Sequence, residues 1–127
     1  MQQFEIFIPK KVDTLSNLLD TIASEGINIK AIATESRDDI FILKIVTQDD
    51  KTTEKVLKNG KYKYNTSEIL SIKLIDRPGE LAKFTKILAK AKINIESIYI
   101  LGKEDGSTEV GIKPDNLELA KKILKII

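Results

Sequence analysis

The tripeptide Ile93-Asn94-Ile95 repeats Ile27-Asn28-Ile29 at a distance of 66 residues. The same offset superposes further apolar residues on one another: Leu15 on Leu81, Ala23 on Ala89 and Ile32 on Ile98. Towards the end of each copy the offset becomes 67, because the second copy contains one extra residue. Such a repeat decides the fold, so the 127-residue chain is predicted to consist of two similar units in tandem.

Each unit is predicted to contain strand, helix, strand, strand and helix. In the second unit, alternating apolar residues over 69–75 predict a strand, and apolar residues three and four apart over 80–91 predict a helix. Two strands follow at 93–101 and 108–113, and Asp105-Gly106 between them is a hairpin turn signal. The last helix is lined by apolar residues at helical spacing: Leu117, Ala120, Ile123, Leu124 and Ile127.

The first unit follows the same order and adds a fourth strand. Its expected elements are strands at 3–8, 27–35 and 40–47 and helices at 13–24 and 49–58. Asn59-Gly60 is expected to end the second helix, because both residues tolerate the left-handed conformation, and 61–68 is the fourth strand. The result is a βαββαβ unit of the α+β class, an antiparallel sheet with both helices on one face, known as the ferredoxin-like arrangement.

The second unit lacks a counterpart of the segment 61–68. The chain is therefore predicted to divide into a complete unit, 1–68, and a unit without its fourth strand, 69–127. The fourth strand of this fold lies beside the first, so the strand 69–75 is expected to have an open edge, which folded proteins normally cover. We expect a strand from another chain, or rearranged pairing by 62–68, to cover it.

The composition excludes several kinds of chemistry. The chain contains no cysteine and no histidine, so it cannot form a thiolate nucleophile, a Ser-His-Asp triad or a zinc site of the usual ligands. Few activated groups remain, and no pair of carboxylates at helical spacing suggests acid–base catalysis. We therefore expect no enzymatic activity, no catalytic residue, no metal and no cofactor.

Charge and hydropathy narrow the choice of partners. The 21 basic and 19 acidic residues leave a net charge of only +2, without the basic excess typical of nucleic-acid binders. Apolar runs such as Ile40 to Leu43 are far too short to span a membrane, and the first residues do not resemble a secretory signal. We expect a cytoplasmic protein that binds neither nucleic acid nor a membrane.

The sharpest local signal is Asp76-Arg77-Pro78-Gly79-Glu80-Leu81, between the first strand and the first helix of the second unit. Pro78 keeps Arg77 extended, and Gly79 lets the backbone turn tightly. The free N–H groups and the dipole of the helix that follows suit a small anion such as a carboxylate, and Asp76 can pair with an ammonium group. Together these features suit a free amino acid.

These residues resemble the signature of the ACT domain, a small-molecule regulatory module of amino-acid metabolism. The signature has Asp or Asn, any residue, Pro-Gly, any residue and Leu, then a helix and Gly-Ile-Asn-Ile. The second unit matches it with Asp76 to Leu81 and Ile93-Asn94-Ile95, although Lys92 replaces the glycine. The first unit keeps Gly26-Ile27-Asn28-Ile29 but has Lys10-Lys11-Val12-Asp13 where Pro-Gly is expected.

The resemblance implies a non-catalytic regulatory protein. ACT domains are usually fused to the enzymes that they control, or act as separate regulatory subunits. This chain is therefore expected to bind a free amino acid or a related small ligand and to modulate an enzyme, or its own assembly, in trans. The implied partners are a second copy, giving a homodimer, and a metabolic enzyme. The alternative is an ACT-like module that binds no ligand and only dimerises or docks onto a partner.

The resemblance also implies where the ligand binds. The first loop and the start of the second strand lie at opposite ends of a unit, so Asp76 and Asn94 are not expected to touch one small ligand. Similar domains pair edge to edge, which predicts a composite site between domains from Asp76, Arg77, Pro78, Gly79, Glu80, Leu81, Asn28 and Ile29. A weaker second site would combine Lys11, Val12, Asp13, Asn94 and Ile95. We expect one competent site per chain, because only the first has an intact loop.

The same residues also have structural explanations. The loop can be a strand-to-helix turn in a domain that has lost its ligand, and Asn28 and Asn94 can cap the starts of strands. Tyr62 and Tyr64 are expected to pack on one face of the fourth strand. Four lysines are expected to form solvated helix surface: Lys83, Lys86, Lys90 and Lys92.

Overall fold

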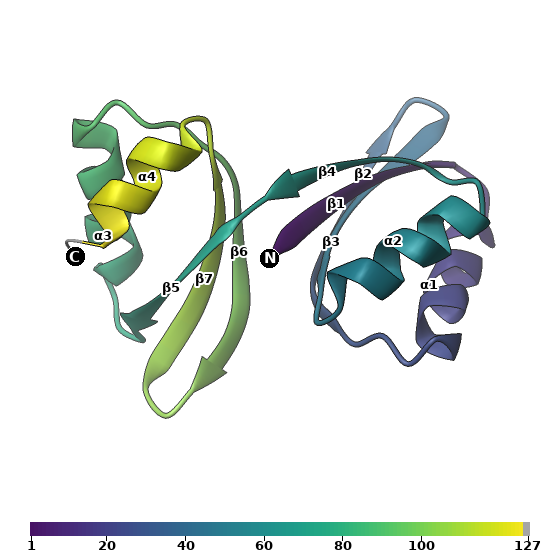
Figure 1. The fold of residues 1–127 in the computed structure, drawn as a ribbon, viewed down its shortest axis with the longest axis horizontal. Helices are drawn as coiled ribbons and strands as arrows, with labels where there is room; N and C mark the ends of the chain where they lie inside the picture. Colours follow the sequence, from purple (N-terminus) through teal and green to yellow (C-terminus); the bar gives the residue numbers. More distant parts are fainter. Residues whose placement is uncertain (126–127) are drawn as a thin grey trace. The chain divides into compact units, whose positions relative to one another are not determined.

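Figure 1 shows the fold in a computed structural model, which describes residues 1–125. The chain divides into two compact units between Ser67 and Glu68. Each unit is an antiparallel sheet with two helices on one face, which confirms the predicted pair of ferredoxin-like units. Ile127, which was expected to line the last helix, lies outside the described residues.

The first unit has the predicted order βαββαβ. Its elements are β1 (Gln2–Pro9), α1 (Thr14–Ser24), β2 (Ile29–Arg37), β3 (Ile40–Thr47), α2 (Asp50–Asn59) and β4 (Lys63–Glu68). The strand order is β2-β3-β1-β4, so the fourth strand lies beside the first, as expected.

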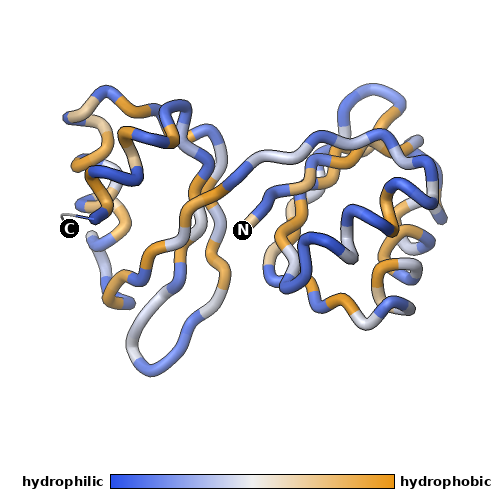
Figure 2. The backbone as a smooth tube through the Cα atoms, in the orientation of Figure 1, coloured by the Kyte–Doolittle hydropathy of each residue, from blue (hydrophilic) through white to orange (hydrophobic). Residues whose placement is uncertain are grey.

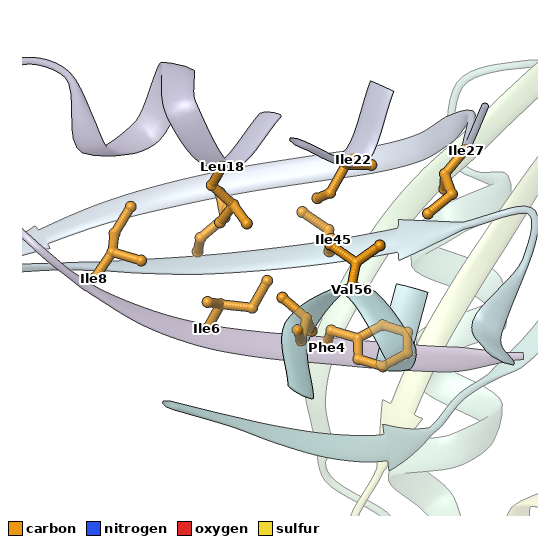
Figure 3. Packing of buried hydrophobic residues seen from close by; sticks show 10 residues of the cluster. Phe4, Ile6, Ile8, Leu18, Ile22, Ile27, Ile45 and Val56 are labelled. Carbon is orange, nitrogen blue, oxygen red and sulfur yellow. The ribbon is translucent and has the colours of Figure 1, made fainter. Parts of the chain in front are cut away.

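The first core lies between this sheet and its two helices (Figure 3). Alternate residues of β1 face the helices, and Phe4, Ile6 and Ile8 are almost fully buried. Figure 2 shows apolar residues, in orange, along the strands of both units. The partners of β1 in this core include residues of both helices: Leu18 and Ile22 of α1, and Val56 and Leu57 of α2. Each such side chain contributes about 1.5–3 kcal/mol through burial.

The tyrosines next to and within β4 cover one side of this core. Tyr62 and Tyr64 pack against it, as predicted, and the ring of Tyr64 lies 6.3 Å from that of Phe4. The Tyr64 hydroxyl donates a hydrogen bond to Glu54 (3.1 Å). Burial, together with this carboxylate, raises the pKa of Tyr64. The fourth strand therefore both pairs with β1 and completes the burial of the core.

The second unit has one strand fewer. Its elements are β5 (Leu70–Ile75), α3 (Glu80–Lys90), β6 (Ile95–Glu104), β7 (Ser107–Pro114) and α4 (Leu117–Leu124). The order is β5-β7-β6, so β5 is an edge strand within residues 1–125, which confirms the missing fourth strand. The expectation that the segment 62–68 covers this edge is wrong, because that segment supplies β4 to the first sheet.

The extra residue of the second copy lies in β6. Both second strands carry a bulge near their start, but β6 has another between Ile100 and Gly102. A bulge shifts the register by one residue and therefore exchanges the faces of the residues that follow. Beyond it, Lys103 pairs with Thr108 and shares the helix-covered face of the sheet with the buried Val110.

One predicted turn has the expected backbone, and the end of α2 does not. Asp105 and Gly106 both have positive φ (45° and 77°), as the predicted hairpin turn requires. The end of α2 differs, because Gly60 has φ −81° and Lys61 is the left-handed residue, at φ 57°. Gly60 is needed for space instead, since a Cβ at this position would lie 2.5 Å from the ring of Tyr62.

Candidate ligand site in the second unit

The loop between β5 and α3 turns with short backbone hydrogen bonds. The Asp76 N–H donates to the Gly106 carbonyl (2.8 Å), and the Arg77 N–H donates to the Ile75 carbonyl (3.0 Å). Gly79 then adopts φ 89°, in the left-handed region that other residues enter at a cost, and α3 begins at the next residue. The loop thus presents the first N–H groups of a helix beside the carboxylate of Asp76.

Two ion pairs set the electrostatics of this loop. The Lys103 ammonium lies 3.5 Å from the Asp76 carboxylate, and both side chains are about half exposed. The Arg77 Nε donates to Glu80 (2.6 Å), whose side chain is largely buried. Sequence reasoning missed Lys103, because its position depends on the β6 bulge and nothing near Asp76 in the sequence indicates it.

A hollow of about 150 Å³ adjoins the loop on the helix-covered face of the sheet. Four charged side chains belong to its lining, and the other lining residues are mainly apolar. Its lining residues are Leu74, Ile75, Asp76, Arg77, Glu80, Leu81, Ile100, Lys103, Thr108 and Val110. Four of the six predicted loop residues therefore line one small depression. Pro78 and Gly79 shape the turn beside it.

Asn94 lies at the far end of the second unit from this loop. It precedes β6, whereas Lys103 near the end of β6 contacts Asp76, so about 30 Å of strand separates the two ends. The Asn94 side chain donates to Asp115 (3.0 Å), and the Asn94 N–H donates to the other oxygen of the same carboxylate (3.1 Å). Asn94 therefore ties the start of β6 to the end of β7.

Asn28, the equivalent residue of the first unit, is held differently. Gln48 stands at the position of Asp115, and its N–H donates to the Asn28 backbone carbonyl (3.1 Å), as the Asp115 N–H does to that of Asn94 (3.0 Å). Only the bonds to the Asp115 carboxylate have no equivalent. The side-chain amide of Asn28 is exposed, and no residue in the described part of the chain hydrogen-bonds to it. Ile29, which follows it, is half-buried against the first core. The two asparagines thus differ in how much of their hydrogen-bonding capacity is already used.

The first unit keeps the backbone hydrogen bonds of the loop without its Pro-Gly, although Asp13 has φ −104° where Gly79 has φ 89°. The Lys10 N–H donates to the Asp39 carbonyl (2.9 Å) and the Lys11 N–H to the Pro9 carbonyl (2.9 Å), which are the same two bonds as in the second unit. The side chains differ, because Lys10 replaces Asp76 and inverts its charge. Val12 is fully exposed, and Asp13 is the right-handed N-cap residue of α1.

The comparisons with known proteins fit this pair of units. The model of the ACT domain pair family matches residues 1–126. The chain belongs to this family. ACT domain pairs are regulatory domains, and no helix within residues 1–125 is long and apolar enough to cross a membrane. A search of the curated proteins finds no match.

Solved structures show the same fold of paired ACT domains. Protein BT0572 from Bacteroides thetaiotaomicron has 27% identity and a TM-score of 0.89, with 98% of this chain and 85% of that chain covered. The regulatory subunit of aspartate kinase from Thermus thermophilus, in its ligand-free form, has 18% identity and a TM-score of 0.70, with 98% and 87% covered.

Lys92 of the second domain replaces the glycine of the ACT signature but keeps its backbone conformation. Gly26 of the first ACT domain has φ 72°, and Lys92 adopts the same left-handed conformation at φ 60°. Their N–H groups make equivalent bonds, to the carbonyls of Ala23 and Ala89 (2.9 Å each). The second domain therefore keeps the turn at a cost of about 1 kcal/mol for a residue with a Cβ. Lys83, Lys86 and Lys90 are exposed on α3, as predicted, whereas Lys92 is exposed but follows the end of the helix.

Proposed function

We propose that the chain is a non-catalytic regulatory protein that binds a free amino acid, or a similar small ligand, at the loop of the second ACT domain. The observation that carries the proposal is the Asp76 carboxylate beside the first turn of α3, at the rim of the 150 Å³ hollow. A carboxylate and the N–H groups of the first turn of α3, of which the Glu80 N–H already donates to the Arg77 carbonyl (3.4 Å), match the ammonium and the carboxylate of an amino acid.

The difference between the two loops supports one competent site per chain. Lys10 at the position of Asp76 would repel the ammonium of the ligand, although the first loop makes the same backbone hydrogen bonds. Asn28, whose side-chain amide is not used within the described chain, belongs with Ile29 to the competent site in this proposal. Asn94, occupied by Asp115, belongs with Ile95 and with Lys11, Val12 and Asp13 to the weaker one.

Regulation requires that the ligand binds two states with different affinity. A ligand that contacts residues of two domains favours the state in which those domains are held together. The chain would then act in trans, on its own assembly as a homodimer or on a metabolic enzyme. The likeness to an aspartate kinase regulatory subunit, at 18% identity, is one of fold and leaves the choice of enzyme open.

Thermal unfolding in the presence of each of the twenty amino acids tests the proposal. A ligand at about 100 times its dissociation constant adds about 2.7 kcal/mol and raises the melting temperature by several degrees. Asp76→Asn should abolish the shift, whereas Lys10→Asn, at the equivalent position of the first domain, should leave it unchanged. No shift with any amino acid would contradict amino-acid binding, and so would a shift that Asp76→Asn leaves intact.

The second candidate is a ligand-free interaction module, and the open edge of β5 favours it. Within residues 1–125 this strand pairs on one side only, and Ile75 at its end is 55% exposed. The same melting experiment separates the two candidates. A module without ligand shows no shift with any amino acid, but its melting temperature rises with protein concentration, because association stabilises the folded state.

A further inference from the structure

We infer that Asp76 and Lys103 together form a receptor for the two charges of an α-amino acid, and that the adjoining hollow selects a small branched aliphatic side chain. The inference deepens the proposed function and rests on it. It assigns a binding role to Lys103 and a size-determining role to Thr108, residues that the ACT signature does not include.

The ion pair is placed to open at low cost. The Lys103 ammonium and the Asp76 carboxylate are 3.5 Å apart, with 58% and 43% of their side chains exposed. An exposed pair of this kind contributes only about 0–1 kcal/mol. A zwitterion inserted between them gives each charge a new partner: its ammonium binds Asp76, and its carboxylate binds Lys103 in addition to the N–H groups at the start of α3. No charge is left without a partner, so the exchange costs little electrostatic energy.

The hollow beside this pair is neutral. Arg77, the other cation at its rim, is already held by Glu80 at 2.6 Å. The remaining lining is mainly apolar and includes Leu74, Ile100 and the buried Val110. A charged or strongly polar side chain of the ligand would lose its hydration without gaining a partner there, which makes an aliphatic side chain the better fit.

The size of the hollow limits the ligand further. Pockets that hold drug-sized ligands measure about 300–1,000 Å³. At about 150 Å³, this hollow accommodates a side chain of a few carbon atoms but no large aromatic ring system. Burial of such a side chain contributes about 0.8 kcal/mol for each methylene group, so that valine, leucine and isoleucine should bind more tightly than glycine.

The first domain shows what removes such a site. The register of the β2–β3 hairpin puts Ser36 opposite Phe41, as that of β6–β7 puts Lys103 opposite Thr108. The first domain thus has Ser36 in place of the ammonium. Phe41 packs against the first core, on the side where the smaller Thr108 leaves the hollow of the second domain open. Lys10 also replaces Asp76. The anion, the cation and the open hollow are therefore all present in the second domain and all absent from the first.

Calorimetric titration of the full chain with L-leucine, L-isoleucine and L-valine tests the inference. Two further probes each lack one charge: 4-methyl-2-oxopentanoate has no ammonium, and 3-methylbutylamine has no carboxylate. Lys103→Met should weaken binding of the amino acids by about tenfold to a hundredfold, the loss of one charge-assisted hydrogen bond. It should not weaken binding of the amine, because Met removes the cation that competes with the amine for Asp76. Lys90→Met, at an exposed position of α3, is the matched control and should change neither.

Thr108→Phe tests the hollow separately from the charges. It should weaken L-leucine at least about tenfold and glycine much less, because glycine places no side chain there. Equal effects of Lys103→Met on leucine and on the amine would overturn the role of Lys103. Tighter binding of an acidic, basic or large aromatic amino acid than of the three aliphatic ones would overturn the assigned side chain. Either of these two outcomes would overturn the inference and leave the proposed function intact. Failure of every amino acid to bind the unaltered chain would contradict the inference and the proposed function alike.

Discussion

The two ACT domains place equivalent strands in different surroundings. β1 lies between β3 and β4, whereas β5 has a neighbour on one side only within residues 1–125. The residues that β1 turns towards its helices, Phe4, Ile6 and Ile8, are at most 2% exposed. Their equivalents in β5, Leu70, Ile72 and Leu74, are only half-buried. A fourth strand therefore does more than supply hydrogen bonds to its neighbour, since it completes the core along that edge.

Truncation of the two central isoleucines measures this difference directly. Ile6→Ala should lower the free energy of unfolding of the first domain by about 2–5 kcal/mol, as expected for a fully buried side chain. Ile72→Ala should cost the second domain roughly half as much, because part of that side chain already contacts solvent. Hydrogen exchange in increasing urea, read separately for each domain, gives both values. Equal losses would mean that β5 is covered in solution as completely as β1.

Hydrogen exchange in β5 shows what covers the edge. We expect a second copy of the chain to pair there, so the β5 amides that point away from β7 should be protected at high protein concentration. Dilution until the copies separate should raise their exchange rates by on the order of a hundredfold, while β1 changes little. Rapid exchange at residues 70–74 at every concentration would show that no second copy covers the strand.

The turn before each second strand provides a smaller contrast. Lys92→Gly should stabilise the second domain by about 1 kcal/mol, because the left-handed conformation at φ 60° no longer opposes a Cβ. Gly26→Ala should destabilise the first domain by a similar amount, and for conformational reasons alone, because no atom lies within 4 Å of the new Cβ. Thermal unfolding measures both changes. A lower melting temperature for Lys92→Gly would show that the lysine side chain itself stabilises the turn.

The smallest expected effect is a pH dependence confined to one domain. Asp49, the N-cap of α2, accepts hydrogen bonds from the Thr52 hydroxyl (2.7 Å) and N–H (3.1 Å), and these lower its pKa below the ordinary 3.8. Asn116, the equivalent cap of α4, accepts from the Leu119 N–H (3.1 Å) and does not titrate. Because folding lowers the pKa of Asp49, its contribution is present above 3.8 and is lost as the pH falls through the lowered value.

Exchanging the two caps therefore exchanges the pH dependence. Asp49→Asn should flatten the fall in melting temperature of the first domain below pH 3.8, while still accepting the Thr52 N–H. Asn116→Asp should introduce such a fall in the second domain. Melting curves recorded from neutral to acidic pH provide the measurement. The amide hydrogen exchange of each domain identifies which of the two unfolds. An unchanged profile for Asp49→Asn would assign the acid sensitivity of the first domain to another carboxylate.

The fold could be predicted from the sequence because the repeat, the apolar periods and the turn residues agree with one another. The strand 40–47 has the predicted bounds, and the hairpin turn at Asp105-Gly106 has the expected backbone. The predicted end of α2 at Asn59-Gly60 is confirmed, but the left-handed residue is Lys61 and not Gly60, which local propensity favours for that conformation. The ring of Tyr62, which approaches Gly60 only in the folded chain, sets that position instead.

The candidate site could be predicted only as far as its loop. Asp76 and Gly79 have local roles that neighbouring residues reveal, but Lys103 reaches Asp76 across 27 residues through a bulge that no local pattern indicates. The first loop shows the converse. Its hydrogen bonds match those of the second although Lys11, Val12 and Asp13 replace the Pro-Gly pattern, so motif loss did not mean loss of the turn. The pairing of the second loop with Asn28 and Ile29 remains a prediction.

The β6 bulge also bears on how the two copies diverged. Carried through this strand, the offset of 66 residues would set Arg37 against Lys103 and suggest that both copies keep a cation near the hairpin turn. The register shows Ser36 there instead, opposite Phe41, whereas Arg37 pairs with Ile40 and points to the other face of the sheet. Substitution of Lys10 by aspartate and of Ser36 by lysine would therefore place both charges in the first domain without any change of length. Comparisons among ACT domain pairs should accordingly count residues of this hairpin back from its turn, and not forward from the Ile-Asn-Ile tripeptide.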